Sequence, residues 1–378
     1  MKRILLVTSA YTGAGHKSIS DALTEQFSQM PDVEVKVIDG FELMGSKGIR
    51  LSRLYGFLTR RAPAVFNASW RFTNTHPPRF SFSARLCSHS FLEIIDEFHP
   101  DLILTVHSLL NVTLTQILKK HNLNLPVVVV QADLVDIHSS WCNPEAFMTI
   151  CPTREAYDTS VLQGMPPEKL KVFGFPVRRR FCDAAREADT SERPLSNPPH
   201  CLLMSGGEGC GSLMDYAESI LENTDLTLTI ICGRNKKLFS RLQNRVGKQY
   251  GNRVTVLGFV SDVEQDMLDS DLLIVRGSPN TLSEAVTMNV PVIMIGPLLE
   301  QEKNNPRLMQ HYNLGVTCRS PAEAPKVIRS LLKDHGARIR EIRASQRAFR
   351  SFDSARNITG FIVELIDKLS DTVPIQEQ

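Results

Sequence analysis

Residues 2–18 read KRILLVTSAYTGAGHKS, an apolar run followed by a turn with two glycines and then a polar stretch. A buried strand that ends in a glycine turn and opens a helix is typical of the first unit of a parallel α/β fold. The turn resembles a nucleotide-binding P-loop, but that pattern needs a glycine directly before the lysine, where this chain has His16. The stretch therefore predicts a strand, a tight turn and a helix that starts with a histidine.

The alternation of apolar runs and helical stretches continues along all 378 residues. Strands are predicted at 4–9, 33–39, 101–107, 126–133, 147–152 and 171–177, and again at 201–207, 226–233, 253–260, 271–277 and 291–296. Between the two sets, residues 183–199 are charged, rich in proline and without apolar periodicity, which indicates a linker. We predict two doubly wound domains, 1–182 and 200–378, that face a central cleft. A last helical stretch at 337–369 is expected to pack back on the first domain.

Composition narrows the class of protein. The formal net charge of +2 argues against bulk nucleic-acid binding, and the eight cysteines form no C-x-x-C pair, so neither a zinc ribbon nor a dithiol motif is supported. Cysteines inside apolar strands fit a reducing cytoplasm. The first apolar run is too short for a signal peptide, and no run approaches the roughly 18 residues of a membrane span. We expect a cytoplasmic protein that at most touches a membrane surface.

One segment has an unusual charge distribution. Residues 43–92 contain no Asp or Glu, but they contain many basic and aromatic side chains, among them Arg60, Arg61 and Trp70. Such a composition suits docking on an anionic lipid surface, and it also suits a solvated basic surface over buried aromatics.

The unusual residues of the second domain follow its strands, where ligands bind in parallel α/β sheets. Residues 205–212, SGGEGCGS, place four glycines before a helix. Residues 276–286, RGSPNTLSEAV, open a helix whose free N–H groups suit a diphosphate, and Glu284 lies one turn further on. Residues 300–305, EQEKNN, group polar side chains after a later strand. Each taken alone also fits an ordinary turn or a solvated surface.

In the first domain, residues 131–141 read QADLVDIHSSW and follow the most apolar strand. They carry Asp133, Asp136, His138 and Trp141, but not at the spacing of a known metal motif, so no metal is expected. His107, at the end of another strand, is a further candidate, although a structural histidine is the more common case.

These motifs occur together in one known family. TGAGHKSISDAL, HPDLILTVHS, ADLVDIHSSW, KVFGFPVRRRF, GGEG, ICGRN, LGFVSDVEQDM, DLLIVRGSPNTLSEA and EQEKNN follow in this order from Lys2 to about Asn313. The chain resembles the monogalactosyldiacylglycerol synthase and processive diacylglycerol glucosyltransferase family. It is more distantly similar to the N-acetylglucosaminyltransferase that makes lipid II.

The resemblance implies an α/β GT-B fold, with an acceptor-binding first domain and a second domain that binds a UDP-sugar. By motif, Gly207, Glu208 and Arg234 lie at the nucleotide, and Phe259 and Val260 hold the uracil by backbone contacts. Ser278, Pro279, Asn280 and Thr281 bind the diphosphate, Glu284 the ribose, and Gln301 and Glu302 the sugar. Gly15, Arg60, Arg61, Trp70, His138 and Trp141 serve the acceptor or the membrane.

The sequence departs from the family at two positions. The diphosphate loop usually carries more glycines and a preceding lysine, whereas this chain has Arg276 before Gly277 and then Ser278, Pro279 and Asn280. Asn280 tolerates a positive φ, which is the conformation that a lost glycine would have allowed. The acidic motif that usually reads Thr-Asp is Ala132-Asp133 here.

The resemblance gives His16 a role. At the start of a helix that faces the predicted cleft, a neutral imidazole accepts the proton of an acceptor hydroxyl, and Asp133 competes for this role as base. We expect an inverting transfer of a hexose from a UDP-sugar to a diacylglycerol-type lipid, without cofactor or metal, at the inner face of the cell membrane. The alternatives are a soluble acceptor, a UDP-sugar 2-epimerase and a UDP-sugar-binding protein without catalysis.

Overall fold

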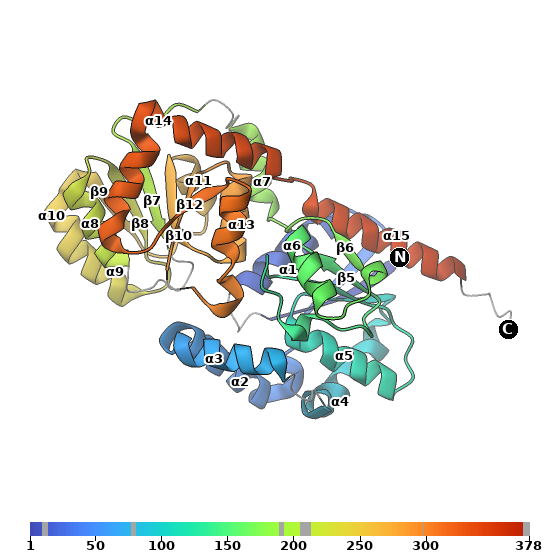
Figure 1. The fold of residues 1–378 in the computed structure, drawn as a ribbon. Coiled ribbons are helices and arrows are strands. Elements are labelled where there is room, and N and C mark those ends of the chain that lie inside the picture. The colour runs from blue at the N-terminus through green and yellow to red at the C-terminus, as the bar shows by residue number, and fades with distance from the viewer. Residues whose placement is uncertain (10–13, 77–80, 189–192, 205–212, 297, 373–378) are drawn as a thin grey trace. The chain divides into compact units, whose positions relative to one another are not determined.

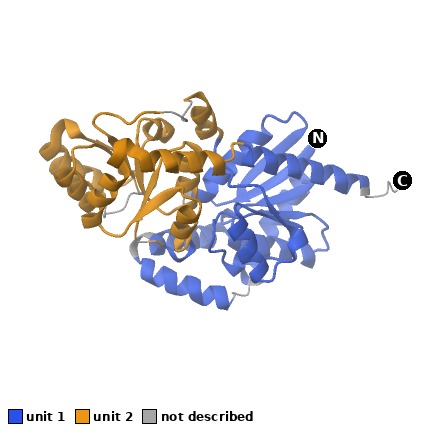
Figure 2. Cartoon of the chain, turned by 45° about the horizontal axis from the view of Figure 1, so that its top comes forward, with its two compact units in different colours: residues 1–178, 299–301, 353–378 blue, residues 179–298, 302–352 orange. Residues whose placement is uncertain are grey.

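The computed structural model describes residues 1–9, 14–76, 81–188, 193–204, 213–296 and 298–372, and Figure 1 shows their ribbon. The chain divides into two compact units, coloured separately in Figure 2. Unit 1 comprises residues 1–178, 299–301 and 353–378, and unit 2 comprises residues 179–298 and 302–352. Each unit contains one six-stranded sheet in which every described pairing is parallel.

The sheet of unit 1 has the order β2-β1-β3-β4-β5-β6. Its strands are β1 (Lys2–Thr8), β2 (Val33–Asp39), β3 (Leu102–Thr105), β4 (Val127–Val130), β5 (Met148–Cys151) and β6 (Leu170–Val172). The central strands β3 and β4, and β1 from Ile4 onward, are mainly apolar and buried, because helices cover a parallel sheet on both faces.

The helices of unit 1 are α1 (Ala14–Phe27), α2 (Gly45–Arg61), α3 (Pro63–Thr75), α4 (Ser81–Phe98), α5 (Ser108–Lys120), α6 (Arg154–Leu162) and α15 (Ser354–Thr372). α4 and α5 contribute Phe91, Leu110 and Leu114 to a core cluster with sheet residues such as Val7. α15 packs against α1, and the Lys2 amine forms an ion pair with Asp367 at 3.0 Å. The last helix therefore completes the unit that the first strand begins.

The sheet of unit 2 has the order β12-β11-β10-β7-β8-β9. Its strands are β7 (His200–Met204), β8 (Thr227–Ile231), β9 (Val254–Leu257), β10 (Leu272–Arg276), β11 (Val292–Ile295) and β12 (Gly315–Cys318). Its principal helices are α7 (Arg179–Glu187), α8 (Leu213–Asn223), α9 (Lys236–Leu242), α11 (Val263–Leu268), α12 (Pro279–Thr287), α13 (Asn305–His311) and α14 (Ala324–Phe349). The predicted fold class of two doubly wound α/β sheets is confirmed.

Some elements differ from those predicted. α2, α3 and β12 were not predicted, and α7 occupies the start of the segment expected to be a linker. The stretch expected as one helix at 337–369 is interrupted between α14 and α15. Within α14, Lys333–Gly336 have non-helical dihedrals, and Asp334, His335 and Gly336 adopt positive φ. Glycine adopts such angles without a steric penalty, so the break ends at a residue suited to it.

Gly315 explains how β12 fits the edge of its sheet. A β carbon built there lies 2.5 Å from the carbonyl oxygen of Val292 on the neighbouring strand, and backbone cannot move away as a side chain can. We expect Gly315→Ala to lower the free energy of unfolding by about 1–3 kcal/mol, measured by urea denaturation. The control is Gly360→Ala in α15, where the same β carbon meets nothing within 4 Å. Equal stability of the two variants would contradict this packing argument.

Candidate active site

The site residues of unit 1 gather at the point where the strand order of the sheet reverses. β2 lies on one side of β1, and β3 to β6 lie on the other, so the loops after β1 and β3 diverge at their carboxyl ends. Ligands of doubly wound sheets bind at such a switch point. Two histidines lie here: His16, which follows Gly15 in the first turn of α1, and His107, two residues after β3.

A backbone hydrogen bond sets the tautomer of His16. Its Nδ1 lies 2.6 Å from the carbonyl oxygen of Val106, and a carbonyl oxygen only accepts, so Nδ1 carries the hydrogen. The lone pair of the neutral ring is therefore on Nε2. Burial lowers the pKa of His16 to about 4, although the hydrogen bond to Val106 acts in the opposite direction. At neutral pH the ring is an uncharged base.

His107 packs against His16, with the two ring centroids 4.5 Å apart and the planes tilted by 43°. Its Nδ1 accepts the backbone N–H of Leu109 at 3.2 Å and so caps α5. The side chain is buried, and burial together with the neighbouring His16 holds the pKa of His107 well below its usual value. Two neutral imidazoles thus share this end of the sheet.

Asp133 is oriented by Trp141. The indole Nε1 of Trp141 donates to Oδ2 of Asp133 at 2.7 Å, and the indole ring centroid lies 6.2 Å from that of His16. Trp141 belongs to the short helix η2 (Ser139–Trp141) and is 2% exposed. The structure therefore brings both candidate bases, His16 and Asp133, around one buried tryptophan.

His138 joins this loop to α3. Its Nδ1 lies 2.8 Å from Ser140 Oγ and its Nε2 lies 3.1 Å from Thr73 Oγ1, while Trp70 packs edge-on against the ring. The amide side chain of Asn74 accepts the N–H of Ser139 at 2.7 Å. Both ring nitrogens of His138 are engaged within the protein, so its predicted contact with an acceptor stays a prediction. The contributions of Thr73 and Asn74 were not predicted.

In unit 2 the switch point lies between β7 and β10. The loop after β10 leads into α12, where Ser278 precedes Pro279 and Asn280 in the first turn. Ser278 Oγ donates to Thr281 Oγ1 at 3.0 Å, and the Asn305 amide donates to the carbonyl oxygen of Gly277 at 2.7 Å. Asn280 is helical, so the loop does not require the positive φ considered from the sequence.

The remaining donor-site candidates of unit 2 fall into three groups. Glu284 is buried in α12, and Glu302 is buried with its carboxylate 3.8 Å from Arg276. Arg234 stacks over the ring of Phe259, 4.2 Å from its centroid, and Phe259 is 55% exposed beside Val260. Gly207 and Glu208 lie outside the described residues. The structure thus pairs an exposed aromatic face with a cation at the ends of β8 and β9.

The remaining predicted site residues are Gln301, Arg60 and Arg61. Gln301 lies in the short helix η6 (Glu300–Glu302), next to Glu302 in the chain. Arg60 and Arg61 are the last residues of α2, but their side chains lie outside the description.

Among the described residues, no group of three His, Cys, Asp or Glu side chains is placed to hold a metal ion. None of the described helices is long and apolar enough to cross a membrane.

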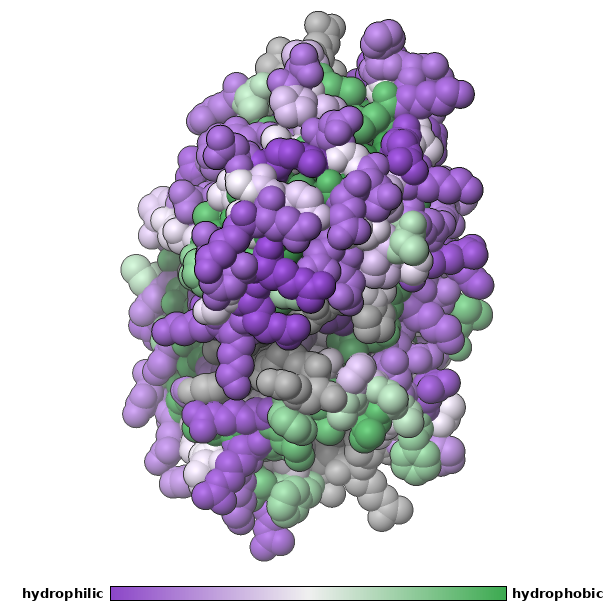
Figure 3. Space-filling view, turned by 90° about the vertical axis from the view of Figure 1, so that its left-hand side faces the viewer, coloured by the Kyte–Doolittle hydropathy of each residue, from purple (hydrophilic) through white to green (hydrophobic). Residues whose placement is uncertain are grey.

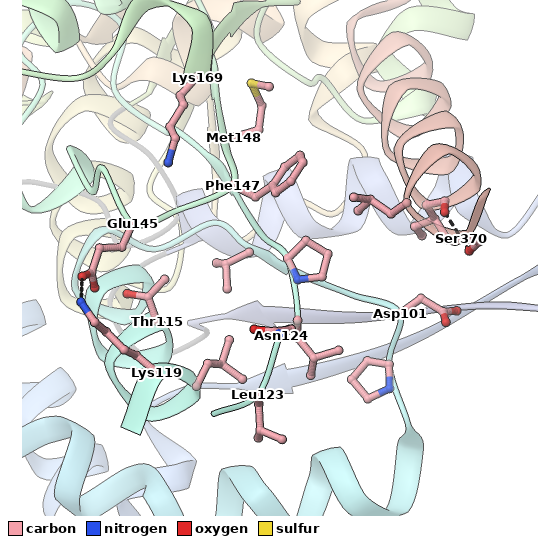
Figure 4. Close-up of a pocket in the computed structure, with 17 residues that line it drawn as sticks. Asp101, Thr115, Lys119, Leu123, Asn124, Glu145, Phe147, Met148, Lys169 and Ser370 are labelled. Carbon is pink, nitrogen blue, oxygen red and sulfur yellow. Dashed lines mark hydrogen bonds and ion pairs between the residues drawn. The ribbon is translucent and has the colours of Figure 1, made fainter. Parts of the chain in front are cut away.

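A groove of about 960 Å³ opens at the other edge of the unit 1 sheet, where β4 and β5 begin (Figure 4). Its charged side chains have partners within the protein: Lys119 pairs with Glu145, and the Lys169 amine donates to the carbonyl oxygens of Pro144 and Ala146 at 2.6 and 3.1 Å. No predicted site residue lines this groove. The two candidate bases, His16 and Asp133, lie instead after the carboxyl ends of β1 and β4.

Comparison with solved structures defines the class of fold. MurG of Acinetobacter baumannii matches with a TM-score of 0.65 at 15% identity, over 96% of this chain and 100% of that chain. The UDP-GlcNAc 2-epimerase of Neisseria meningitidis bound to UDP-GlcNAc matches with a TM-score of 0.62 at 12% identity, over 96% and 100%. At these identities the likeness shows the fold alone, and the predicted GT-B class is confirmed.

Comparison of sequences identifies the family. Residues 16–177 match the model of monogalactosyldiacylglycerol (MGDG) synthase, and residues 202–351 match the C-terminal domain of glycosyltransferase family 28. The MGDG synthase of Spinacia oleracea is 29% identical over 86% of this chain and 65% of its own length. Synthase 1 of Arabidopsis thaliana is 28% identical over 86% and 64%. Both are named as chloroplastic. The resemblance to the MGDG synthase family that the motifs indicated is confirmed by these matches.

The pKa of His16 has a consequence for stability. The folded pKa of about 4 is below the ordinary value of 6.5, so between these two values the unfolded chain binds a proton that the folded chain does not. The contribution of His16 to the free energy of unfolding is therefore complete above pH 6.5 and is lost as the pH falls toward 4. We expect the free energy of unfolding, measured with urea, to fall between pH 7 and pH 5, and to fall less in His16→Gln. The same loss in wild type and variant would show that His16 does not carry it.

Proposed function

We propose that this chain is an inverting glycosyltransferase that moves a hexose from a UDP-sugar to the hydroxyl of a diacylglycerol-type lipid. The observation that carries the proposal is the hydrogen bond from His16 to the Val106 carbonyl, because it leaves a neutral Nε2 lone pair at the switch point. The matches to the MGDG synthase and glycosyltransferase family 28 models support the reaction class. The lipid acceptor is supported by the similar plant proteins, which are named monogalactosyldiacylglycerol synthases.

In the proposed reaction, Nε2 of His16 takes the proton of the acceptor hydroxyl while the oxygen bonds to the anomeric carbon. The bond from that carbon to the diphosphate oxygen breaks, and UDP leaves with the electron pair. Attack opposite the leaving group inverts the configuration. Asp133 is the second candidate for the base, but one of its oxygens already accepts the Trp141 indole hydrogen.

The donor is proposed to bind at the carboxyl ends of the unit 2 strands. The N–H groups at the start of α12 and the hydroxyls of Ser278 and Thr281 suit a diphosphate, whose charge they would stabilise as it departs. The exposed ring of Phe259, with Arg234 stacked on it, offers a flat surface for uracil. These fixed dipoles can stabilise the leaving group without a metal, and no metal or other cofactor is proposed.

The first test measures UDP release from UDP-glucose and UDP-galactose, with and without diacylglycerol in anionic liposomes, in the presence and absence of EDTA. We expect lipid-dependent release that EDTA does not change, and about a 10²–10⁴-fold loss in His16→Ala because the general base is removed. Asp133→Asn is measured in the same assay to distinguish the two candidate bases, because the loss should be large only where the base itself is removed. His311→Ala, an exposed histidine of unit 2, is the matched control.

Each alternative function has its own outcome in this assay. Tight binding of a UDP-sugar without release indicates a binding protein, and conversion of the sugar without an acceptor indicates a 2-epimerase. Release that depends on a soluble acceptor and not on lipid rules out the membrane reaction. Any of these three results would contradict the proposal.

Docking to the membrane is proposed to use α2 and α3. Leu51, Leu54 and Phe57 on α2 and Val65 and Phe72 on α3 are each more than half exposed. Apolar side chains reach the surface in the lower part of the space-filling view, where these helices lie (Figure 3). Lys47, Arg50, Arg53 and Arg71 are exposed on the same two helices. Basic and apolar groups on one surface suit the inner, anionic face of a cell membrane, from the cytoplasmic side.

We expect the double variant Leu54→Ser and Phe57→Ser to bind anionic liposomes at least about tenfold more weakly, because two apolar side chains can no longer enter the lipid. Co-sedimentation measures the binding. Leu162→Ser on α6 is the control, since this leucine is 87% exposed on another helix. Equal binding by the double variant and the control would place the docking surface elsewhere.

A further inference from the structure

His107 lies beside the proposed base, His16, and its side chain also caps the helix α5. The side chain is 3% exposed at the carboxyl end of β3, next to β1. Its Nδ1 accepts the Leu109 N–H, so its hydrogen is on Nε2. His16 has the opposite tautomer, with its hydrogen on Nδ1. A backbone group therefore sets the tautomer of each ring.

The two rings form one wall of the site. The His107 ring has its centroid 4.5 Å from that of His16, and Phe41 packs edge-on against His107 with 5.1 Å between centroids. This stack excludes water from one side of His16. The centroid of Trp141 lies 6.2 Å from that of His16.

We propose that His107 is a positioning residue for His16: its ring fixes the plane of the His16 imidazole and keeps water from it, so that Nε2 stays neutral and directed at the acceptor. The inference rests on the proposed role of His16 as the base. It goes beyond the role of His16 because it gives His107 a part in the reaction. The capping hydrogen bond alone would make His107 only a structural residue of α5.

The surrounding charges do not account for a neutral His16. On α1, Lys17 is paired with Asp21 at 2.7 Å, and both are exposed. Beyond Phe41, the carboxylate of Asp39 accepts the Phe41 N–H at 2.8 Å, and Asp133 is held by Trp141 at 2.7 Å. Burial is the largest cause of the low pKa of His16. A residue that maintains the burial therefore controls the protonation of the base.

Two substitutions separate the wall from the cap. His107→Phe keeps an aromatic ring beside His16 but cannot accept the Leu109 N–H. His107→Asn keeps a side chain that is preferred at the start of a helix, but it removes the ring. If the ring contact with His16 matters, His107→Phe should be the more active variant. If the hydrogen bond to Leu109 matters, His107→Asn should be the more active variant.

The expected result is a shift in the acid limb of kcat/KM against pH. In wild type we expect the rate to fall as His16 protonates, near its pKa of about 4. In His107→Asn water reaches His16, so we expect the limb to move up toward the ordinary value near 6.5, with kcat about 10–100-fold lower and KM for the UDP-sugar unchanged. His107→Phe should keep the wild-type limb. If His107→Asn kept the wild-type acid limb and kcat while His107→Phe lost them, the proposal would be overturned.

The NMR titration of His16 keeps the inference testable without activity. If His16→Ala is as active as wild type, the proposed function of His16 fails, but the imidazole of His16 can still be titrated in both His107 variants. A raised pKa of His16 in His107→Asn and an unchanged pKa in His107→Phe support the wall. Equal values in the two variants contradict it, whatever the enzyme assay shows.

Discussion

Parallel strand pairing is the constraint on which the site depends. β1 and β3 run side by side in the same direction, with Val7 opposite Thr105, so their carboxyl ends finish at the same edge of the sheet. The loops that leave these two ends carry His16 and His107, which are far apart in sequence and touch in the fold. β4 ends at the same edge and leads to Asp133. An antiparallel strand would have carried one of these groups to the opposite edge.

Much of this architecture could be predicted from the sequence because buried parallel strands are continuously apolar. The runs at 126–133 and 271–277 contain β4 and β10, and the polar residues after them form the candidate site. β12 was missed because it begins with glycine and its sequence, GVTC, holds only two apolar residues. α2 and α3 were missed because apolar and basic side chains share their exposed surface, which removes the usual separation of faces.

The contacts within the site could not be predicted from residue types. Thr73 and His138 are 65 positions apart, and only the fold shows that a hydroxyl on α3 faces the imidazole. The same holds for the tautomer of His16, because it depends on a carbonyl 90 residues away. Side-chain hydrogen bonds between distant segments follow from the tertiary arrangement, whereas strand periodicity is local.

The position of α15 has a consequence for the order in which the protein is made. Unit 1 begins at residue 1 but includes 353–378, so all of unit 2 is synthesised before unit 1 has its last helix. α15 buries Ile358 and Ile362 and packs on α1, and until it leaves the ribosome that surface of α1 stays open to water. Domains generally fold as they emerge, N-terminal first. Here the second unit is complete first, and a chain released early carries a finished unit 2 beside an unfinished unit 1.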